Sequence, residues 1–309
     1  MKGYAVCRRA AGLGTHAPSA EPGVAAVTKQ LAHGRQRGSW ALLAAMVLSA
    51  GIVPALATPL PDRATQGQLV VASVQPGEQV WVGNRALRVD ADGRYVFGIA
   101  RDAASAITVR IRHVDGHTST HRLRVTPRDW PIERVDGVPP RTVDPPPDIA
   151  ARIAREQSRV AEARSLDSAL DGFGQSFIWP VSGRISGRFG SERRYNGKHG
   201  SPHSGMDIAA PAGTPVRAPA SGRVIFADRD LYLTGGTLVI DHGHGVSSVF
   251  LHLSRLDVAV GDRIDQGQVI AAVGATGRAS GPHLHWGMNW FDTRLDPLLV
   301  VPAPATHRP

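Results

Sequence analysis

The sequence predicts a mainly β protein: an N-terminal β-sandwich domain, a helical linker and a C-terminal, glycine-rich antiparallel β domain. Short runs of β-branched and aromatic residues recur along most of the chain, separated by glycine or proline. The 34 glycines and 23 prolines among 309 residues favour turn-rich β structure over long helices. Apolar residues have helical spacing in one long stretch, residues 148–173. These observations together predict two β domains joined by a helix.

Residues 1–57 precede the first predicted strand and are interpreted as a signal peptide or N-terminal extension. Arg35 and Arg37 come before an apolar run, residues 40–57, that contains Pro54 and ends in an Ala-Leu-Ala sequence. A basic segment, an apolar segment and a small-residue ending are typical of a secretory signal, with cleavage expected after the last alanine. The competing interpretation is an uncleaved anchor, because the run approaches the length that spans a bilayer. Contact with a membrane is expected only through this segment.

Residues 58–138 are predicted to form the small β sandwich. Its strands are expected at residues 68–74, 79–82, 86–89, 95–97, 106–112 and 121–125. Alternating apolar residues within these runs, and Pro-Gly or Asp-Gly turns between them, are typical of small antiparallel sandwiches. His113, His117 and His121 are interpreted as solvated side chains and not as metal ligands.

Residues 139–175 are predicted to form a Pro-rich linker and the helix. Prolines at positions 139, 140, 145, 146 and 147 stiffen the chain before the helix. Asp148 is expected to be the N-cap of a helix that runs to about Phe173. Charged residues occupy one face, so the helix is interpreted as a spacer that packs on its other side.

Residues 176–301 are predicted to form the second β domain, and residues 302–309 a disordered tail. Strands are expected at residues 216–218, 223–226, 237–240, 247–251, 263–264, 269–273 and 283–286. Glycines mark the turns between these strands. The tail is rich in proline and follows the last predicted strand.

Charge and cysteine content exclude several functions. The formal net charge is +9, but more than half of it comes from residues 1–57. The rest of the chain has no basic patch interleaved with aromatic residues, so nucleic-acid binding is not expected. The single cysteine, Cys7, lies in the same N-terminal segment, which leaves the predicted domains without disulfides or cysteine metal sites.

Two short motifs in the second β domain carry metal-binding side chains. They are His203-Ser-Gly-Met-Asp207 and His283-Leu-His285. Mixed nitrogen and oxygen donors hold catalytic zinc, and three protein ligands leave the fourth position for water. His252, between the motifs, and the imidazole left over from the second motif are available for proton transfer. The set of side chains indicates a metal-dependent hydrolase.

The expected local structure allows the two motifs to converge. Glycine and proline oppose a helix around His203 and Asp207, so both are expected on a loop that bends at Gly205 and enters a strand. His283 and His285 are two residues apart and would face the same side of a strand. That pair supplies two ligands, or one ligand and one acid–base group.

The remaining histidines are not expected to be metal ligands, and two motifs of other hydrolase classes are absent from the sequence. His199, His242, His244 and His307 are interpreted as structural or surface residues. His242 and His244 form another His-x-His pair, but glycines flank it, which makes a poor support for rigid ligands. The sequence contains neither His-Glu-x-x-His nor Gly-x-Ser-x-Gly, so a helical zinc protease and a serine hydrolase of that type are excluded.

Residues 176–300 resemble the lysostaphin/LytM-type zinc metalloendopeptidase family of peptidoglycan hydrolases, which has a glycine-rich all-β fold. The matching segments are residues 203–216, 240–243, 250–253, 260–262, 267–268, 274–278, 281–285 and 296–297. Phe250 departs from the family pattern, which often has tyrosine there, so a hydroxyl contact with substrate is expected to be missing. The upstream sandwich and helix also resemble the N-terminal module of some secreted members.

The resemblance assigns roles to five residues. It implies that His203, Asp207 and His285 hold one Zn²⁺ per chain. It implies that His252 and His283 are the catalytic pair, and it leaves open which of them is the general base.

A sixth residue, Asn196, lies in a segment that resembles the mouth of the family's groove. The resemblance implies that Asn196 contacts substrate or metal.

The expected function is a zinc-dependent endopeptidase that hydrolyses peptide cross-links of bacterial peptidoglycan, in the periplasm or as a secreted protein. One alternative is a catalytically inactive relative that activates cell-wall amidases. Such proteins lose metal ligands, whereas this sequence retains the full set. A second alternative is a secreted zinc protease that acts on another protein substrate.

Overall fold

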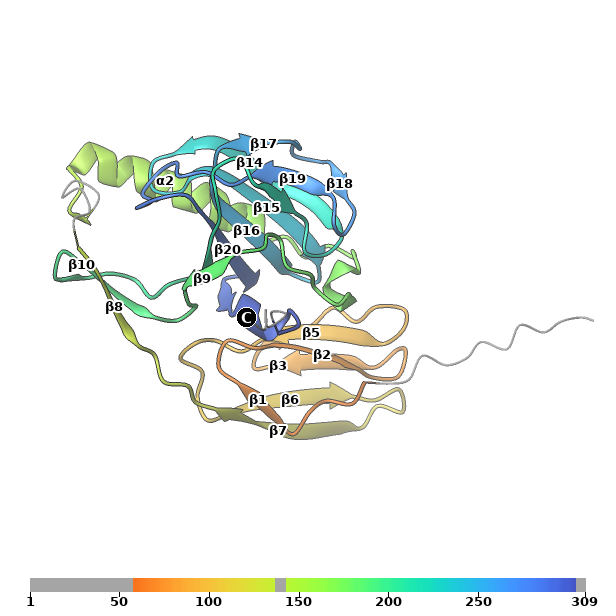
Figure 1. Cartoon of the computed structure of the whole chain (residues 1–309). Helices are drawn as coiled ribbons and strands as arrows, with labels where there is room; N and C mark the ends of the chain where they lie inside the picture. Colours follow the sequence, from red (N-terminus) through yellow and green to blue (C-terminus); the bar gives the residue numbers. More distant parts are fainter. Residues whose placement is uncertain (1–57, 137–142, 304–309) are drawn as a thin grey trace, which may run out of the picture. The chain divides into compact units, whose positions relative to one another are not determined.

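The computed structural model describes residues 58–136 and 143–303 (Figure 1). The predicted signal peptide, the first prolines of the linker and most of the predicted tail lie outside the described residues. All described residues belong to one structural unit, Val53–Pro309. None of the helices in the described ranges combines the length and the apolar character that a membrane span requires.

The N-terminal region consists of two small sheets, as its alternating pattern predicts. The strands are β1 (Arg63–Thr65), β2 (Leu69–Ser73), β3 (Gln79–Val82), β4 (Arg85–Ala86), β5 (Arg94–Gly98), β6 (Ala106–Arg112) and β7 (Thr118–Thr126). One sheet has the order β1-β7-β6-β3-β4 and the other pairs β2 with β5. The β1–β7 pair is parallel, which differs from the wholly antiparallel sandwich expected. Apolar side chains fill the core, among them Val70, Phe97, Val109 and Leu123.

A further strand, β8 (Ile132–Val135), follows this region and was not predicted. It pairs in parallel with β10 (Glu192–Tyr195), so Glu133 lies opposite Arg193. The segment that leads out of the N-terminal sheets therefore adds a strand beside the metal-binding part of the chain.

The helix, α2 (Pro147–Arg164), is shorter than predicted and begins differently. Pro146 occupies the N-cap position without a side-chain hydrogen bond, and Asp148 lies in the first turn. A carboxylate there is favourable because the N-terminal end of a helix carries partial positive charge.

The helix ends about nine residues before the expected Phe173, and both a local bond and a long-range bond accompany its end. The hydroxyl of Ser165 donates to the carbonyl of Glu162 at 2.7 Å, which satisfies one of the last helical carbonyls. The carbonyl of Ser168 then accepts from the backbone N–H of His244 at 2.9 Å. The chain after the helix therefore follows a turn of the neighbouring sheet, and Phe173 falls in the short 3₁₀ helix η1 (Gly172–Gly174).

The C-terminal region is built from many strands, as its glycine-punctuated pattern predicts. They are β9 (Arg184–Gly187), β10, β11 (Lys198–His199), β12 (Met206–Ala209), β13 (Pro215–Arg217), β14 (Gly222–Leu231), β15 (Gly235–Gly243), β16 (Val246–Leu253), β17 (Arg255–Leu256), β18 (Arg263–Ile264), β19 (Val269–Ala272), β20 (His283–Trp290) and β21 (Thr293–Leu295), followed by the 3₁₀ helix η2 (Pro297–Leu299).

An eight-stranded sheet dominates this region. Its order is β18-β14-β15-β16-β20-β12-β9, with β21 paired to β20. The strands β14, β15, β16 and β20 lie side by side (Figure 1). One face buries Leu238, Phe250 and Trp286 in the main core. Val160 and Ala163 of α2 pack against a second apolar cluster of Phe226, Leu231, Val239 and Val249. The helix thus packs on this sheet on one side, as expected of its amphipathic pattern.

Candidate metal centre and active-site groove

Two neighbouring strands bring the predicted ligands together. The antiparallel pairing of β12 with β20 places Asp207 directly opposite His285. His203 lies in the loop that enters β12, as the sequence predicts. Gly205 allows this loop to approach β20, because a Cβ atom there would lie 2.3 Å from the carbonyl oxygen of Trp286.

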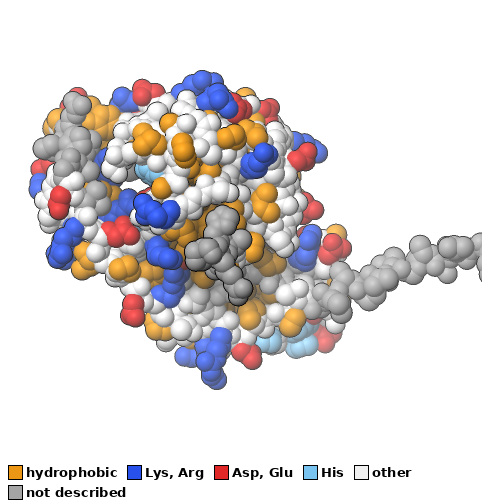
Figure 2. All heavy atoms as spheres, viewed as in Figure 1, with side chains coloured by type: hydrophobic (Ala, Val, Ile, Leu, Met, Phe, Trp, Pro, Cys, Tyr) orange, Lys and Arg blue, Asp and Glu red, His pale blue; other side chains and the backbone are white. Residues whose placement is uncertain are grey.

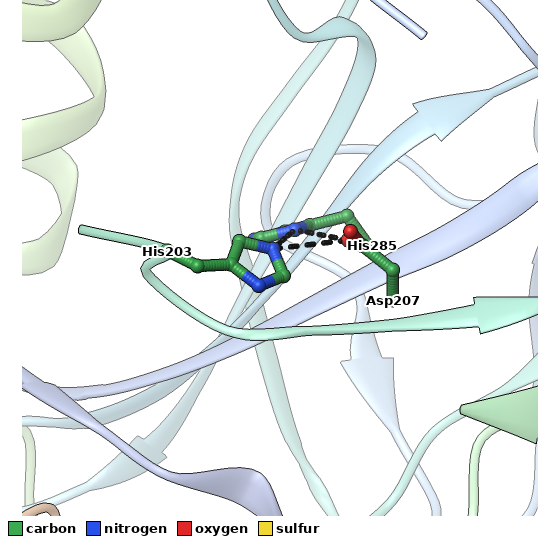
Figure 3. A group of neighbouring side chains, drawn as sticks. All are labelled: His203, Asp207 and His285. Atoms are coloured by element: carbon green, nitrogen blue, oxygen red, sulfur yellow. Dashed lines mark hydrogen bonds and ion pairs between the residues drawn. The ribbon is translucent and has the colours of Figure 1, made fainter. Parts of the chain in front are cut away.

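The ligand atoms of the three side chains point toward one another (Figure 3). His203 Nε2 lies 3.0 Å from His285 Nδ1 and 3.1 Å from Asp207 Oδ1. His285 Nδ1 lies 2.8 Å from Asp207 Oδ1. All three side chains are buried and offer atoms that lie within 4.8 Å of one another. Two imidazole nitrogens and one carboxylate oxygen so arranged suit a tetrahedral zinc ion with one open position.

The hydrogen bonding and burial of the ligand imidazoles leave ring nitrogens available for a metal. His203 Nδ1 lies 2.9 Å from the carbonyl oxygen of Arg188, which only accepts, so Nδ1 carries the proton and Nε2 presents its lone pair to the cluster. Burial lowers the pKa of His285 to about 4, although Asp207 opposes that shift. His285 is therefore neutral at pH 7 and available as a ligand.

The second carboxylate oxygen of Asp207 is held by an arginine. Arg193 Nη2 lies 2.7 Å from Asp207 Oδ2, and Arg193 Nε lies 3.3 Å from Glu133 of β8. Burial would raise the pKa of Asp207, but the close contacts of its Oδ1 with the imidazole nitrogens of His203 and His285 hold that pKa well below its usual range. Asp207 is thus an anion with one oxygen toward the cluster and the other toward Arg193.

The predicted catalytic pair lies beside the ligands. The rings of His252 and His283 have centroids 4.8 Å apart, and His283 Nε2 lies 3.8 Å from Asp207 Oδ1. His252 Nδ1 lies 2.8 Å from the carbonyl oxygen of Thr276, and His283 Nδ1 lies 2.8 Å from that of Gly281. Both imidazoles therefore donate through Nδ1 and keep Nε2 as a proton acceptor.

His252 also has an unusual backbone conformation. Its φ of +63° is uncommon for a residue other than glycine and occurs within β16. Burial lowers the pKa of His252 to about 3, and the neighbouring His285 adds to the effect. Such a conformation persists where the surrounding structure imposes it, which is frequent at functional sites.

These side chains line a groove with a volume of about 1610 Å³. Its walls come from the loops at residues 199–204 and 277–282, from α2, and from residues 100–102 and 133–134. Figure 2 shows a histidine inside a hollow on this surface, with basic side chains gathered beside it.

Asn196 is the residue for which the resemblance implies a contact with substrate or metal. This residue lies in the turn between β10 and β11, is exposed, and has a φ of +49°. Its neighbour Tyr195 lines the groove. A role for Asn196 in substrate binding stays a prediction.

The other histidines have structural partners. His242 is fully buried, with Nδ1 2.8 Å from the Ser221 carbonyl and Nε2 2.8 Å from the Ser248 hydroxyl. His113 was expected to be solvated, but it bonds to Glu78 and stacks on His117. Among the described residues, His203, Asp207 and His285 form the one cluster suited to a metal ion. His307 lies outside the described residues.

Sequence reasoning missed the contribution of Arg193. The segment around Arg193 resembles the family's groove mouth, but a long-range ion pair leaves no local signal in the sequence. The nearest available signal was an arginine 14 residues before a predicted carboxylate ligand.

Residues 201–297 match Peptidase family M23. A solved structure of an M23 peptidase from Pseudomonas aeruginosa is 30% identical, with a TM-score of 0.61, and the match covers 77% of this chain and 94% of that one. The DD-carboxypeptidase/endopeptidase Mpg of Neisseria meningitidis is 42% identical over 103 residues, which are 33% of this chain and 24% of that protein. The peptidoglycan DD-endopeptidase ShyB of Vibrio cholerae is 37% identical over 134 residues, 43% of this chain and 28% of that protein.

The chain thus spans about a quarter of the length of these curated relatives. Its match to the Pseudomonas structure, by contrast, covers nearly the whole of that chain and includes the fold. Since the sequence match also contains the clustered His203, Asp207 and His285, this chain belongs to peptidase family M23.

Proposed function

We propose that this protein is a zinc-dependent endopeptidase that hydrolyses peptide cross-links of bacterial peptidoglycan. The observation that carries the proposal is the convergence of three metal-ligand side chains with two further imidazoles in one groove. Relatives whose names state endopeptidase activity, Mpg and ShyB, support the substrate class.

In this proposal His203, Asp207 and His285 hold one zinc ion per chain. The fit rests on the donor atoms: two imidazole nitrogens and one carboxylate oxygen within 4.8 Å of one another. Bound zinc supplies Lewis acidity, which polarises a peptide carbonyl and acidifies a water molecule. Arg193 keeps one oxygen of Asp207 occupied, so the carboxylate offers the other to the metal.

His252 and His283 perform the proton transfers. Each donates through Nδ1 to a carbonyl oxygen, so Nε2 of either can accept the proton that water loses on attack and pass it to the leaving amine. A protonated imidazole at either position also donates a hydrogen bond to the negative charge that develops on the carbonyl oxygen.

The inactive-activator alternative has less support. A protein that only binds an amidase does not need a complete, buried set of metal ligands. Peptidoglycan lies outside the cytoplasmic membrane, so the proposal also places the mature protein in the periplasm or outside the cell. We retain the division into residues 58–138, 139–175, 176–301 and 302–309 as proposed domain boundaries, which limited proteolysis would test.

The test is incubation of the purified protein with purified peptidoglycan and, in parallel, with casein. We expect soluble peptide fragments from peptidoglycan only, identified by mass spectrometry of the released muropeptides. A chelator should stop the reaction and added zinc should restore it. Cleavage of casein alone would favour the general protease, and no cleavage by zinc-loaded protein would refute the proposal.

A further inference from the structure

Strand β20 contributes His283, His285 and Gly287 to the groove, and the buried Asn289 follows on the same strand. Side chains two apart on a strand face the same side, so Asn289 shares the face that carries His285 and Gly287. Asn289 is four residues from His285, which is about 13 Å along the strand. Gly287 lies between them and leaves this part of the floor without a side chain.

Two arginines from different elements converge on Asn289. Arg164, the last residue of α2, donates from Nη1 to Asn289 Oδ1 at 3.1 Å. Arg294, paired with Asn289 in the β20–β21 ladder, donates from Nη1 to the same oxygen at 2.7 Å. Both arginines line the groove that contains the metal cluster.

The two guanidinium groups have no anionic partner in the described part of the chain. No carboxylate oxygen of the described residues lies within 4.0 Å of a guanidinium nitrogen of Arg164 or Arg294. In addition, Arg164 Nε is buried without a hydrogen-bond partner. Arg164 is only 8% exposed. Asn289 offers one neutral oxygen to both cations.

This arrangement is unfavourable without a ligand. Burial lowers the pKa of Arg164, and burial together with the neighbouring Arg164 lowers the pKa of Arg294 to about 9. The charge of Asp292 partly opposes the lowering of both pKa values by Coulombic attraction, without forming an ion pair. Elsewhere in the groove, Arg193 forms an ion pair with Asp207 at 2.7 Å. Buried charges are normally paired in this way. Two arginines without an ion-pair partner in the groove therefore indicate a site for an anion.

We propose that Arg164 and Arg294 form a subsite for a free carboxylate of the substrate's peptide. This proposal rests on the proposed function and adds a specificity determinant to it. Guanidinium groups bind carboxylates through paired, charge-assisted hydrogen bonds. A separation of about 13 Å corresponds to roughly four residues of extended peptide, so the carboxylate belongs to the same cross-linked peptide as the cleaved bond.

The experiment compares two synthetic cross-linked peptides, one with free carboxylates and one with the same groups amidated. The wild-type protein should cleave the free form with a kcat/KM about 10- to 100-fold higher, the range expected for hydrogen bonds to a charged group. In Arg294→Gln this preference should disappear, mainly through a higher KM, with metal content unchanged. Arg155→Gln is the matched control, because it removes an exposed charge from the same helix.

A second variant and a second measurement guard against misfolding. Arg294→Lys keeps the charge but not the planar fork, and should retain only part of the preference. With wild-type protein alone, high acetate should inhibit cleavage of the free form competitively and leave the amidated form unaffected.

The outcomes separate the two proposals. If the wild type cleaves neither peptide, the proposed function fails. If it cleaves both equally well, or if Arg294→Gln keeps the preference, the carboxylate subsite is wrong. Acetate inhibition of both forms to the same extent would place a general anion site here and would also overturn the substrate assignment.

Discussion

The N-terminal and C-terminal sheets are both formed from short, turn-separated strands, but they bury different side chains. Between residues 58 and 126, Gln66 is the one buried residue with a polar or charged side chain, apart from Tyr95 with its hydroxyl. The C-terminal sheet and its loops bury His203, Asp207, His252, His285, Asn289 and several others.

Burial of polar groups lowers stability unless they are hydrogen-bonded or paired. The N-terminal sheets avoid this penalty and depend on apolar packing. The C-terminal sheet buries polar groups around β20 despite this penalty. These groups form the cluster of metal ligands and the contacts of Arg164 and Arg294 with Asn289. Buried polar side chains, more than the pattern of strands, therefore distinguish the region that contains the candidate active site.

The largest expected effect is that of His285→Ala. Loss of one of three ligands should abolish metal binding and activity together. Metal content by atomic emission and peptidoglycan hydrolysis are the measurements. His121→Ala is the control from the N-terminal sheets, where the imidazole is exposed, and it should change neither. Normal metal content in His285→Ala would contradict the ligand assignment.

Removal of either proton-transfer imidazole should leave the metal in place. His252→Ala and His283→Ala are each expected to reduce kcat by about 100-fold or more, the usual scale for general acid–base catalysis. Metal analysis of the same preparations separates this effect from ligand loss. Rates near wild type in both variants would remove these residues from the mechanism.

A smaller effect is expected for Arg193→Gln, which leaves Asp207 without its ion-pair partner. Loss of such a supporting contact weakens metal affinity by about 10- to 100-fold. Competition with a zinc-binding dye gives the affinity directly. Arg159→Gln removes an arginine that pairs with Asp228 at the surface, and its affinity should equal that of the wild type.

The smallest effect on activity is expected for Leu123→Ala in the N-terminal core, where the side chain is 1% exposed. The cavity should lower the free energy of unfolding by about 2–5 kcal/mol. Metal affinity below the melting temperature should not change. Val114→Ala, at a 69% exposed position, should leave stability nearly unaltered in the same thermal unfolding measurement. A change in metal affinity in Leu123→Ala would show that the two regions are not independent in this respect.

Several features were predicted from sequence because their causes are local. Many strand positions in both regions follow from alternating apolar residues and glycine turns, and the mainly β fold is confirmed. The strand expected at residues 86–89 is an exception, because β4 covers only Arg85–Ala86. The placement of His283 and His285 on one face follows from the two-residue period of a strand. The bent loop at Gly205 follows from the glycine itself.

Other features depend on contacts that sequence does not display. The helix ends at Arg164 because the following residues bond to the turn before β16, so its apolar spacing alone overestimated its length. The parallel pairing of β8 with β10 joins residues about 60 positions apart. Arg193 and the Arg164–Arg294 pair owe their importance to such long-range neighbours.

The sequence by itself determined which chemical groups are present and which local shapes hold them: two imidazoles and a carboxylate in motifs around bends and strands. The tertiary structure alone decided that β12 pairs with β20 in the register that sets Asp207 opposite His285. It alone brought Arg164 of α2 and Arg294 of β21 together on Asn289 of β20. Side-chain chemistry and backbone preference are properties of single residues, whereas strand register is settled by the packing of the whole sheet.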